Sequence, residues 1–172
     1  MIVQAVESVA KTKEEFIMKN QSKIQNAVAC FNDGFNCSQA ILSTYCEELG
    51  LDKKTALQIA CGLGAGMGRL QETCGAVSGA YLLIGLKYGM FSKEDNLARE
   101  KTYALVKEFA QLFEERNTTT NCRKLLDIDL VNGDRQTAAE RVKTICPKMV
   151  QDAAEIIEKL LFSSEGRSPD EA

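Results

Sequence analysis

The sequence predicts an all-α fold, a compact single-domain bundle of about five to seven helices around a buried central helix rich in glycine and alanine. Apolar residues recur at helical spacing in successive segments, and glycine, asparagine or proline separates these segments. No segment alternates apolar and polar residues as a strand does, and no Asn-Gly or Asp-Gly pair connects two such segments. The run Tyr81-Leu-Leu-Ile-Gly-Leu86 has almost no polar side, which indicates a helix buried at the centre.

The size and charge of the chain are typical of one globular domain. With 172 residues, we expect a single helical domain over residues 1–162 and a disordered polar tail over 163–172. The net charge of -3 argues against nucleic-acid binding, which needs a basic face. No apolar run reaches the length of a membrane span, and no basic segment followed by an apolar one marks a secretory signal. We therefore expect a cytoplasmic protein.

Capping residues and glycines divide the first half of the chain. One long or broken helix over residues 2–31 is followed by the stop signal Asn32-Asp33-Gly34. Asn36 can cap the next helix, which ends at Gly50, and Asp52 can cap a third.

A glycine segment and the central helix follow. Four glycines alternate with other residues and allow left-handed backbone or close contact: Gly62, Gly64, Gly66 and Gly68. Thr73 can cap the central helix, which ends at Gly89. Small residues lie at helical spacing on one face of this helix: Gly75, Ala76, Gly79 and Ala80. This face predicts close packing against a neighbouring helix.

The second half contains three more predicted starts. Ser92 and Asp95 form a capping box for a helix that runs to about residue 116, before a break at 117–120. Asn121 can cap a short helical turn over 122–127. After a loop at 128–134 and a helix at 135–144, Pro147 suits the first turn of a last helix.

The cysteines are the main chemical signal. The chain has no histidine, which excludes Ser-His-Asp and Cys-His catalysis and histidine-bound zinc or haem. It has seven cysteines, which in a reducing cytosol favour metal binding or redox chemistry over permanent disulfides. Four of them lie in the first turn of a predicted helix: Cys37, Cys74, Cys122 and Cys146.

A helix N-terminus favours an anion such as a thiolate, which is the reactive form of cysteine. The effect is about 0.3–1 kcal/mol, which is less than one pKa unit. A further cation or a metal is therefore needed, and Arg69, Arg123 and Lys148 lie near three of the cysteines in sequence. If the four converge, a metal ion, an iron–sulfur cluster or disulfide pairing would relieve their repulsion. The spacing alone does not predict convergence, because no Cys-x-x-Cys is present.

The glycine segment does not fit a nucleotide-binding loop. It lacks Gly-x-Gly-x-x-Gly, it follows a predicted helix rather than a strand, and it has no Walker lysine. Close helix packing, or backbone approach to a cofactor, is the better interpretation.

Several motifs together resemble one known family. They are Phe35-Asn36-Cys37-Ser38-Gln39-Ala40, Gly64-Ala-Gly-Met-Gly68, Glu72-Thr-Cys74-Gly-Ala-Val-Ser-Gly79, Asn121-Cys122-Arg-Lys-Leu-Leu126 and Cys146-Pro-Lys-Met-Val150. They resemble the C_GCAxxG_C_C family of redox-active proteins over roughly residues 34–161. The family's Gly-Cys-Ala-x-x-Gly motif has the order Cys74-Gly75-Ala76-x-x-Gly79 here. By this resemblance, the family's four cysteines are Cys37, Cys74, Cys122 and Cys146.

The resemblance implies a prosthetic group and a redox partner protein, as in an oxidoreductase component. A related domain occurs in a cytochrome that has an iron–sulfur site. Our leading hypothesis is a protein that binds an iron–sulfur cluster or other metal through the four cysteines for electron transfer. Arg69 or Arg123 would offset the negative charge. The residues expected to approach the group are Gly64, Gly66, Gly68, Arg69, Gly75 and Gly79.

Two other functions stay open. A metal-free protein could cycle pairs of the four cysteines between dithiol and disulfide, with three pairings allowed. Alternatively, the chain is a helical interaction module whose small-residue faces serve a homodimer and whose cysteines fill the core. A homodimer is expected on general grounds.

Overall fold

The computed structural model describes residues 23–163. This part of the chain is all-α, as predicted, and contains no strand. Residues 23–32 are helical, and seven α-helices follow: α2 (Cys37–Tyr45), α3 (Lys53–Cys61), α4 (Gly64–Met67), α5 (Gly75–Tyr88), α6 (Asn96–Asn117), α7 (Cys122–Leu126) and α8 (Arg135–Ile157). A 3-10 turn at Cys46–Leu49 extends α2, and a π-helical turn at Glu158–Phe162 extends α8. The predicted helix before residue 23 and the tail after 163 lie outside the described residues.

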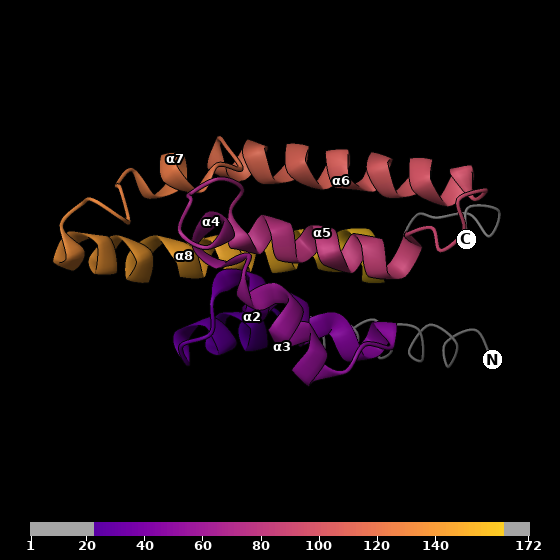
Figure 1. The fold of residues 1–172 in the computed structure, drawn as a ribbon, viewed down its shortest axis with the longest axis horizontal. Helices are drawn as coiled ribbons and strands as arrows, with labels where there is room; N and C mark the ends of the chain where they lie inside the picture. The colour runs from indigo at the N-terminus through magenta and orange to yellow at the C-terminus, as the bar shows by residue number, and fades with distance from the viewer. Residues whose placement is uncertain (1–22, 164–172) are drawn as a thin grey trace, which may run out of the picture.

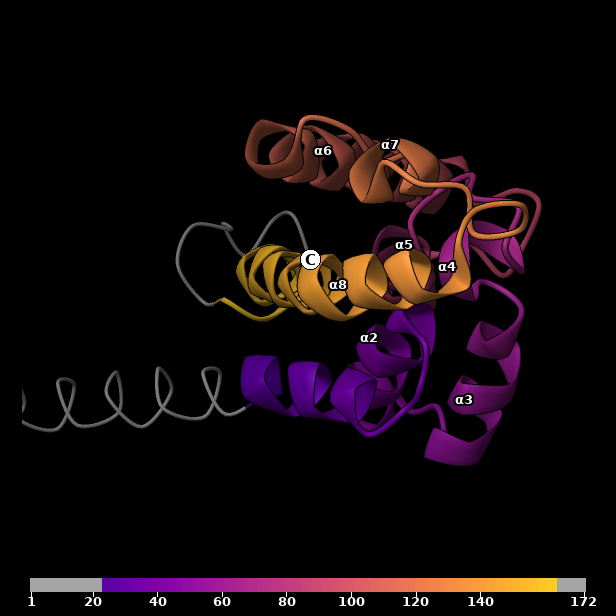
Figure 2. The same cartoon turned by 90° about the vertical axis from the view of Figure 1, so that its left-hand side faces the viewer.

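The helices form three layers. Figures 1 and 2 show α5 and α8 in the middle layer, α6 and α7 on one side, and α2 with α3 on the other. The long helices α5, α6 and α8 run roughly along the same axis, whereas the short helices α4 and α7 gather near one end of the bundle. None of the helices in the described residues is long and apolar enough to cross a membrane.

Helix α5 is the buried central helix that the sequence predicts. Residues 75–80 are all buried, whereas the apolar run over 81–86 is only partly buried, and Leu86 at its end is 38% exposed. A Cβ atom placed on Gly79 would lie 2.9 Å from the Ser38 carbonyl oxygen, and one placed on Gly75 would lie 2.6 Å from the Cys37 Sγ. The small-residue face therefore allows α2 to contact the backbone of α5 directly. Since α2 occupies this face, it is not available to a second copy of the chain.

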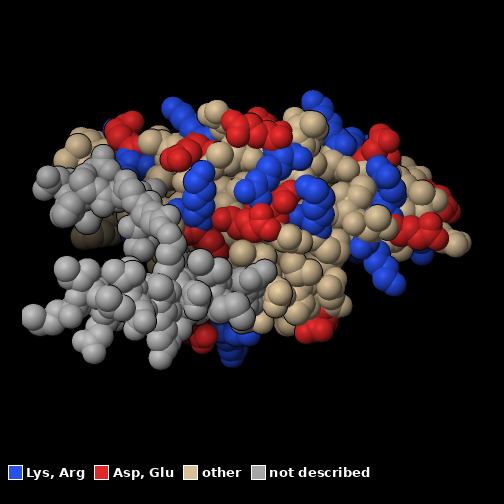
Figure 3. All heavy atoms as spheres, turned by 180° about the vertical axis from the view of Figure 1, so that it is seen from behind, with Lys and Arg blue, Asp and Glu red and all other residues tan. Residues whose placement is uncertain are grey.

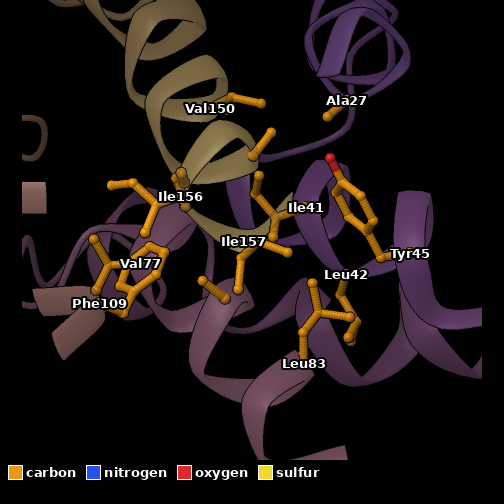
Figure 4. Packing of buried hydrophobic residues seen from close by; sticks show 14 of the residues in the cluster. Ala27, Ile41, Leu42, Tyr45, Val77, Leu83, Phe109, Val150, Ile156 and Ile157 are labelled. Atoms are coloured by element: carbon orange, nitrogen blue, oxygen red, sulfur yellow. The ribbon is translucent and has the colours of Figure 1, made fainter. Parts of the chain in front are cut away.

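The hydrophobic core joins α2, α5, α6 and α8. Figure 4 shows side chains from these helices converging, among them Ile41, Leu83, Phe109 and Ile157, each fully buried. Burial of one such side chain stabilises the fold by about 1.5–3 kcal/mol. The core thereby holds the helix ends that carry the cysteines.

Charged residues cover the outer surface without separating by sign. On the face seen in Figure 3, Lys and Arg side chains alternate with Asp and Glu. Arg116 of α6 pairs with Glu155 of α8 at 2.7 Å, and Lys148 pairs with Asp152 at 2.5 Å. The first pair connects α6 to α8, and the second connects two successive turns of α8.

Three predicted helix starts are wrong in detail. Thr73 does not cap α5, because Cys74 itself occupies the N-cap position. Helix α6 begins at Asn96 with Asp95 as its cap, and the Ser92 hydroxyl instead donates to the Glu94 carboxylate. Pro147 lies inside α8, so the two helices predicted around it are one. Proline normally breaks a helix, but here packing on both sides keeps the axis continuous.

Candidate functional site

Four cysteines line one cavity of about 320 Å³ near the end of the bundle where α4 and α7 lie. They are Cys37 of α2, Cys74 at the start of α5, Cys122 of α7 and Cys146 of α8, and each is less than a tenth exposed. The other lining residues are Phe31, Gly34, Phe35, Asn36, Ala65, Leu125, Leu126, Leu130, Val142, Ile145 and Met149. None of these is a Lys, Arg, Asp or Glu. Among the residues that the structure describes, the lining is therefore mostly apolar, and the four thiols are its only ionisable side chains.

Cys37 is the first residue of α2, and a capping box holds it there. Asn36 Oδ1 accepts from the Gln39 N–H at 3.0 Å, and Gln39 Oε1 accepts from the Asn36 N–H at 3.1 Å. Asn36 Nδ2 also donates to the Cys61 carbonyl at 3.0 Å, which attaches α2 to the end of α3. The predicted cap is confirmed, and it fixes the position of the adjacent thiol.

Cys74 and Cys122 are brought together by a short pairing of two segments. Thr73 and Asn121 form an isolated antiparallel bridge. The Cys74 N–H donates to the Thr120 carbonyl at 2.8 Å, and the Cys122 N–H donates to the Glu72 carbonyl at 2.7 Å. Nothing in the sequence predicts this pairing, because each segment is too short to show strand periodicity.

Cys146 reaches the same cavity from a different position than predicted. We expected it in the first turn of a helix, but it lies in the interior of α8. It lines the cavity together with Val142, Ile145 and Met149, which occupy neighbouring positions at helical spacing on α8. Its thiol therefore receives no help from a helix N-terminus.

The glycine segment passes beside the cavity in left-handed backbone. Six consecutive or near-consecutive residues have positive φ: Ala65, Gly66, Met67, Gly68, Arg69 and Gln71. A Cβ atom on Gly66 would lie 2.6 Å from the Cys122 Cβ, and one on Gly64 would lie 2.3 Å from the Asn36 Cγ. These two glycines make room for residues of the site. In contrast, Gly68 and Arg69 are exposed and do not line the cavity.

Cys37 has the lowest pKa of the four thiols. Its neighbour Cys74 and the backbone N–H groups of Ala65, Cys37 and Ser38 favour its ionised form. Together these donors outweigh burial and lower the pKa of Cys37 from 9.0 to about 7. Ala65 is therefore a functional residue that the sequence analysis missed, since it contributes only its backbone.

The other three thiols are protonated at neutral pH. The hydrogen bond to Cys37, followed by burial, raises the pKa of Cys74 well above its usual value. Burial, followed by the charge on Cys37, raises the pKa of Cys122 to about 11 and that of Cys146 to about 12. The cations expected to compensate are engaged elsewhere, because Arg123 pairs with Asp129 at 3.0 Å and Lys148 pairs with Asp152.

The grouping of possible ligand side chains limits which metal centre could bind without rearrangement. Within residues 23–163, no three His, Cys, Asp or Glu side chains lie close enough together to hold a single metal ion. The four cysteines nevertheless line one pocket of about 320 Å³.

Comparison with known proteins agrees with this arrangement. A family model described as "Putative redox-active protein (C_GCAxxG_C_C)" matches residues 35–160, a range that includes all four cavity cysteines. The chain belongs to this family. The match confirms the resemblance predicted from the sequence, and it shows that the C_GCAxxG_C_C region covers nearly the whole described fold. No curated protein and no solved structure matches the chain.

We expect the Cys37 thiolate to be visible in an ultraviolet titration of the reduced, metal-free protein. The absorbance of one thiolate should rise through about pH 7, since the pKa of Cys37 is about 7 rather than 9.0. Because folding lowers this pKa, the thiolate stabilises the fold fully above pH 9 and loses its contribution as the pH falls through 7.

Two variants control this titration. Cys37→Ser should lack the step, whereas Cys74→Ala removes the S–H donor and should move the step to higher pH. Absence of thiolate absorbance below pH 9 in the wild-type protein would contradict the assignment.

Proposed function

We propose that this chain is a small electron-transfer protein that holds an iron–sulfur cluster, or another group of several metal atoms, between Cys37, Cys74, Cys122 and Cys146. One observation carries the proposal: four buried cysteines from four separate elements line a single pocket of about 320 Å³. Membership of a family described as redox-active supports redox chemistry at these residues. When bound, such a cluster supplies one-electron transfer to a partner protein.

The donor set supports a cluster over other metals. Thiolates favour iron–sulfur clusters, zinc and copper(I), whereas hard cations such as magnesium prefer oxygen ligands. The chain has no histidine and the cavity lining has no carboxylate, so sulfur is the only strong donor available there. These donors suit an iron–sulfur cluster or a soft metal, and a pocket of about 320 Å³ has room for a group of several atoms.

The protonation state of the four thiols determines how metal loading would depend on pH. The raised pKa values of Cys74, Cys122 and Cys146 mean that the metal-free site has at most one thiolate at neutral pH. Since metals bind the thiolate form, loading the site must release protons, and affinity should increase with pH. The N–H groups directed at Cys37 would stay as donors to a metal-bound sulfur, which is a common way to adjust a reduction potential.

Metal and sulfide analysis of anaerobically prepared protein tests this proposal. We expect a coloured protein with visible absorbance, iron and acid-labile sulfide. Zinc without iron or sulfide would indicate a structural zinc site instead of a cluster. A colourless protein without metal, even after anaerobic reconstitution with iron and sulfide, would refute metal binding.

A second candidate function is thiol–disulfide exchange, and the contact between Cys37 and Cys74 favours it. A thiolate with a pKa of about 7 beside a buried thiol is the arrangement of a reactive dithiol. The Cys37 thiolate would attack a partner's disulfide, forming a mixed disulfide and releasing one partner thiolate. After losing its proton to solvent, Cys74 would attack Cys37 Sγ, forming a Cys37–Cys74 disulfide and releasing the second partner thiolate.

Mass spectrometry after oxidation and alkylation distinguishes the two functions. A bridge between Cys37 and Cys74 in metal-free protein, formed reversibly with a disulfide oxidant, would support exchange. If no bridge forms among the four cavity cysteines, this second function is excluded.

A further inference from the structure

We propose that Gln71 is a positioning residue for the four-cysteine site, an inference that rests on the proposed function. Gln71 is 1% exposed, so its long polar side chain is buried. Its backbone is in the left-handed region, with φ +60°, which is strained for a residue other than glycine. It does not line the cavity. Burying a carboxamide costs free energy unless it forms hydrogen bonds. In Gln71, both the Nε2 and the Oε1 atoms form one.

The side chain of Gln71 fixes the segment that follows α7. Its Nε2 donates to the Ile128 carbonyl at 2.7 Å, and its Oε1 accepts from the Leu130 N–H at 2.9 Å. Leu130 lines the cavity. The side chain therefore connects the glycine segment to part of the cavity wall that lies almost sixty residues away in sequence.

The backbone of Gln71 fixes the other end of α7. Its carbonyl accepts from the Arg123 N–H at 3.1 Å, and the adjacent Glu72 carbonyl accepts from the Cys122 N–H at 2.7 Å. Since Cys122 is the first residue of α7, Gln71 and its neighbour hold the start of this short helix while the Gln71 side chain holds the segment after its end. A helix of five residues has little stability of its own.

Gln71 also supports the segment that donates to Cys37. A Cβ atom on Gly66 would lie 2.7 Å from the Gln71 Cα, and the Glu72 N–H donates to the Gly66 carbonyl at 3.1 Å. Ala65, whose N–H points at the Cys37 sulfur, directly precedes Gly66. Displacement of Gln71 would therefore disturb both Cys122 and a hydrogen bond to Cys37.

Native-state alkylation of the reduced, metal-free protein tests the proposal. Gln71→Met keeps the side-chain length and removes both side-chain hydrogen bonds. We expect alkylation of Cys122, relative to the buried core residue Cys46, to become about tenfold faster than in the wild-type protein. Ile157→Val is the matched control, because Ile157 is a fully buried core residue that does not line the pocket, and it should leave this ratio unchanged.

The metal-loaded protein gives a second readout. The reduction potential and visible spectrum should change in Gln71→Met and not in Ile157→Val. Equal alkylation ratios in the two variants, or equal potentials, would overturn the proposal. If Gln71→Met does not fold, Gln71→Asn, which keeps the carboxamide one methylene shorter, should show the same change in the ratio. The alkylation ratio needs no bound metal, so it tests the role of Gln71 even if the protein proves to hold no cluster.

Discussion

Under the proposed function, Cys37→Ser and Cys74→Ser should each remove iron and sulfide from anaerobically prepared protein. Cys37 would be the ligand that ionises most readily, because Cys74 and nearby backbone N–H groups lower its pKa to about 7. A serine hydroxyl in the same place stays protonated and is a poor ligand for iron. Cys74 lies against Cys37 and is 4% exposed, so no solvent-borne ligand can readily replace it.

Cys61→Ser is the matched control for these variants. Cys61 is exposed at the end of α3 and does not line the cavity, so its substitution should leave metal content and the visible spectrum unchanged. Metal content that survives both Cys37→Ser and Cys74→Ser would contradict the assignment of the site. Loss of metal in Cys61→Ser as well would point to a general effect of removing thiols.

Gly79→Val should destabilise the protein by about 3 kcal/mol, near the upper end for overpacking a core. A Cβ atom on Gly79 would lie 2.9 Å from the Ser38 carbonyl oxygen and 3.1 Å from the Ile41 Cβ. Both neighbours belong to the buried helix α2, whose backbone would have to move. Since a domain of this size has about 5–15 kcal/mol of stability in total, one substitution should remove a large part of it.

Gly85 offers an internal comparison on the same helix. A Cβ atom there would meet nothing within 4 Å, so Gly85→Ala should stabilise the protein by up to about 1 kcal/mol through helix propensity. Urea denaturation measures both free energies of unfolding. Equal effects of the two substitutions would show that α2 and α5 do not pack closely through Gly79.

Local sequence signals predicted most of the fold. The caps at Asn36, Asp52 and Asn121 are confirmed, as is the end of the central helix at Gly89. Each of these signals acts within one turn of helix, so neighbouring residues suffice to specify it. Pro147 is the informative failure: a local rule predicted a helix start, and packing of α8 against the rest of the bundle overrode it.

The candidate site was predicted less completely than the fold. The sequence marked the four cysteines and their family, and it predicted that the glycine segment allows close helix packing or backbone approach to a cofactor. It did not predict the role of Ala65, which acts through its N–H alone, or of Gln71, whose partners Ile128 and Leu130 are distant in sequence. Hydrogen bonds between distant segments leave no periodic pattern that a sequence could reveal.

The sequence by itself determined the helical architecture, the family and the identity of the four cysteines, because helical period, capping and motif order are local properties. Only the tertiary structure decided that these cysteines meet in one pocket and that Cys37 has the lowest pKa among them. The pKa order depends on burial and on donors from other segments, such as Ala65 and Cys74. Such quantities arise only when the layers pack, since the chain must first bring together residues that lie more than a hundred positions apart.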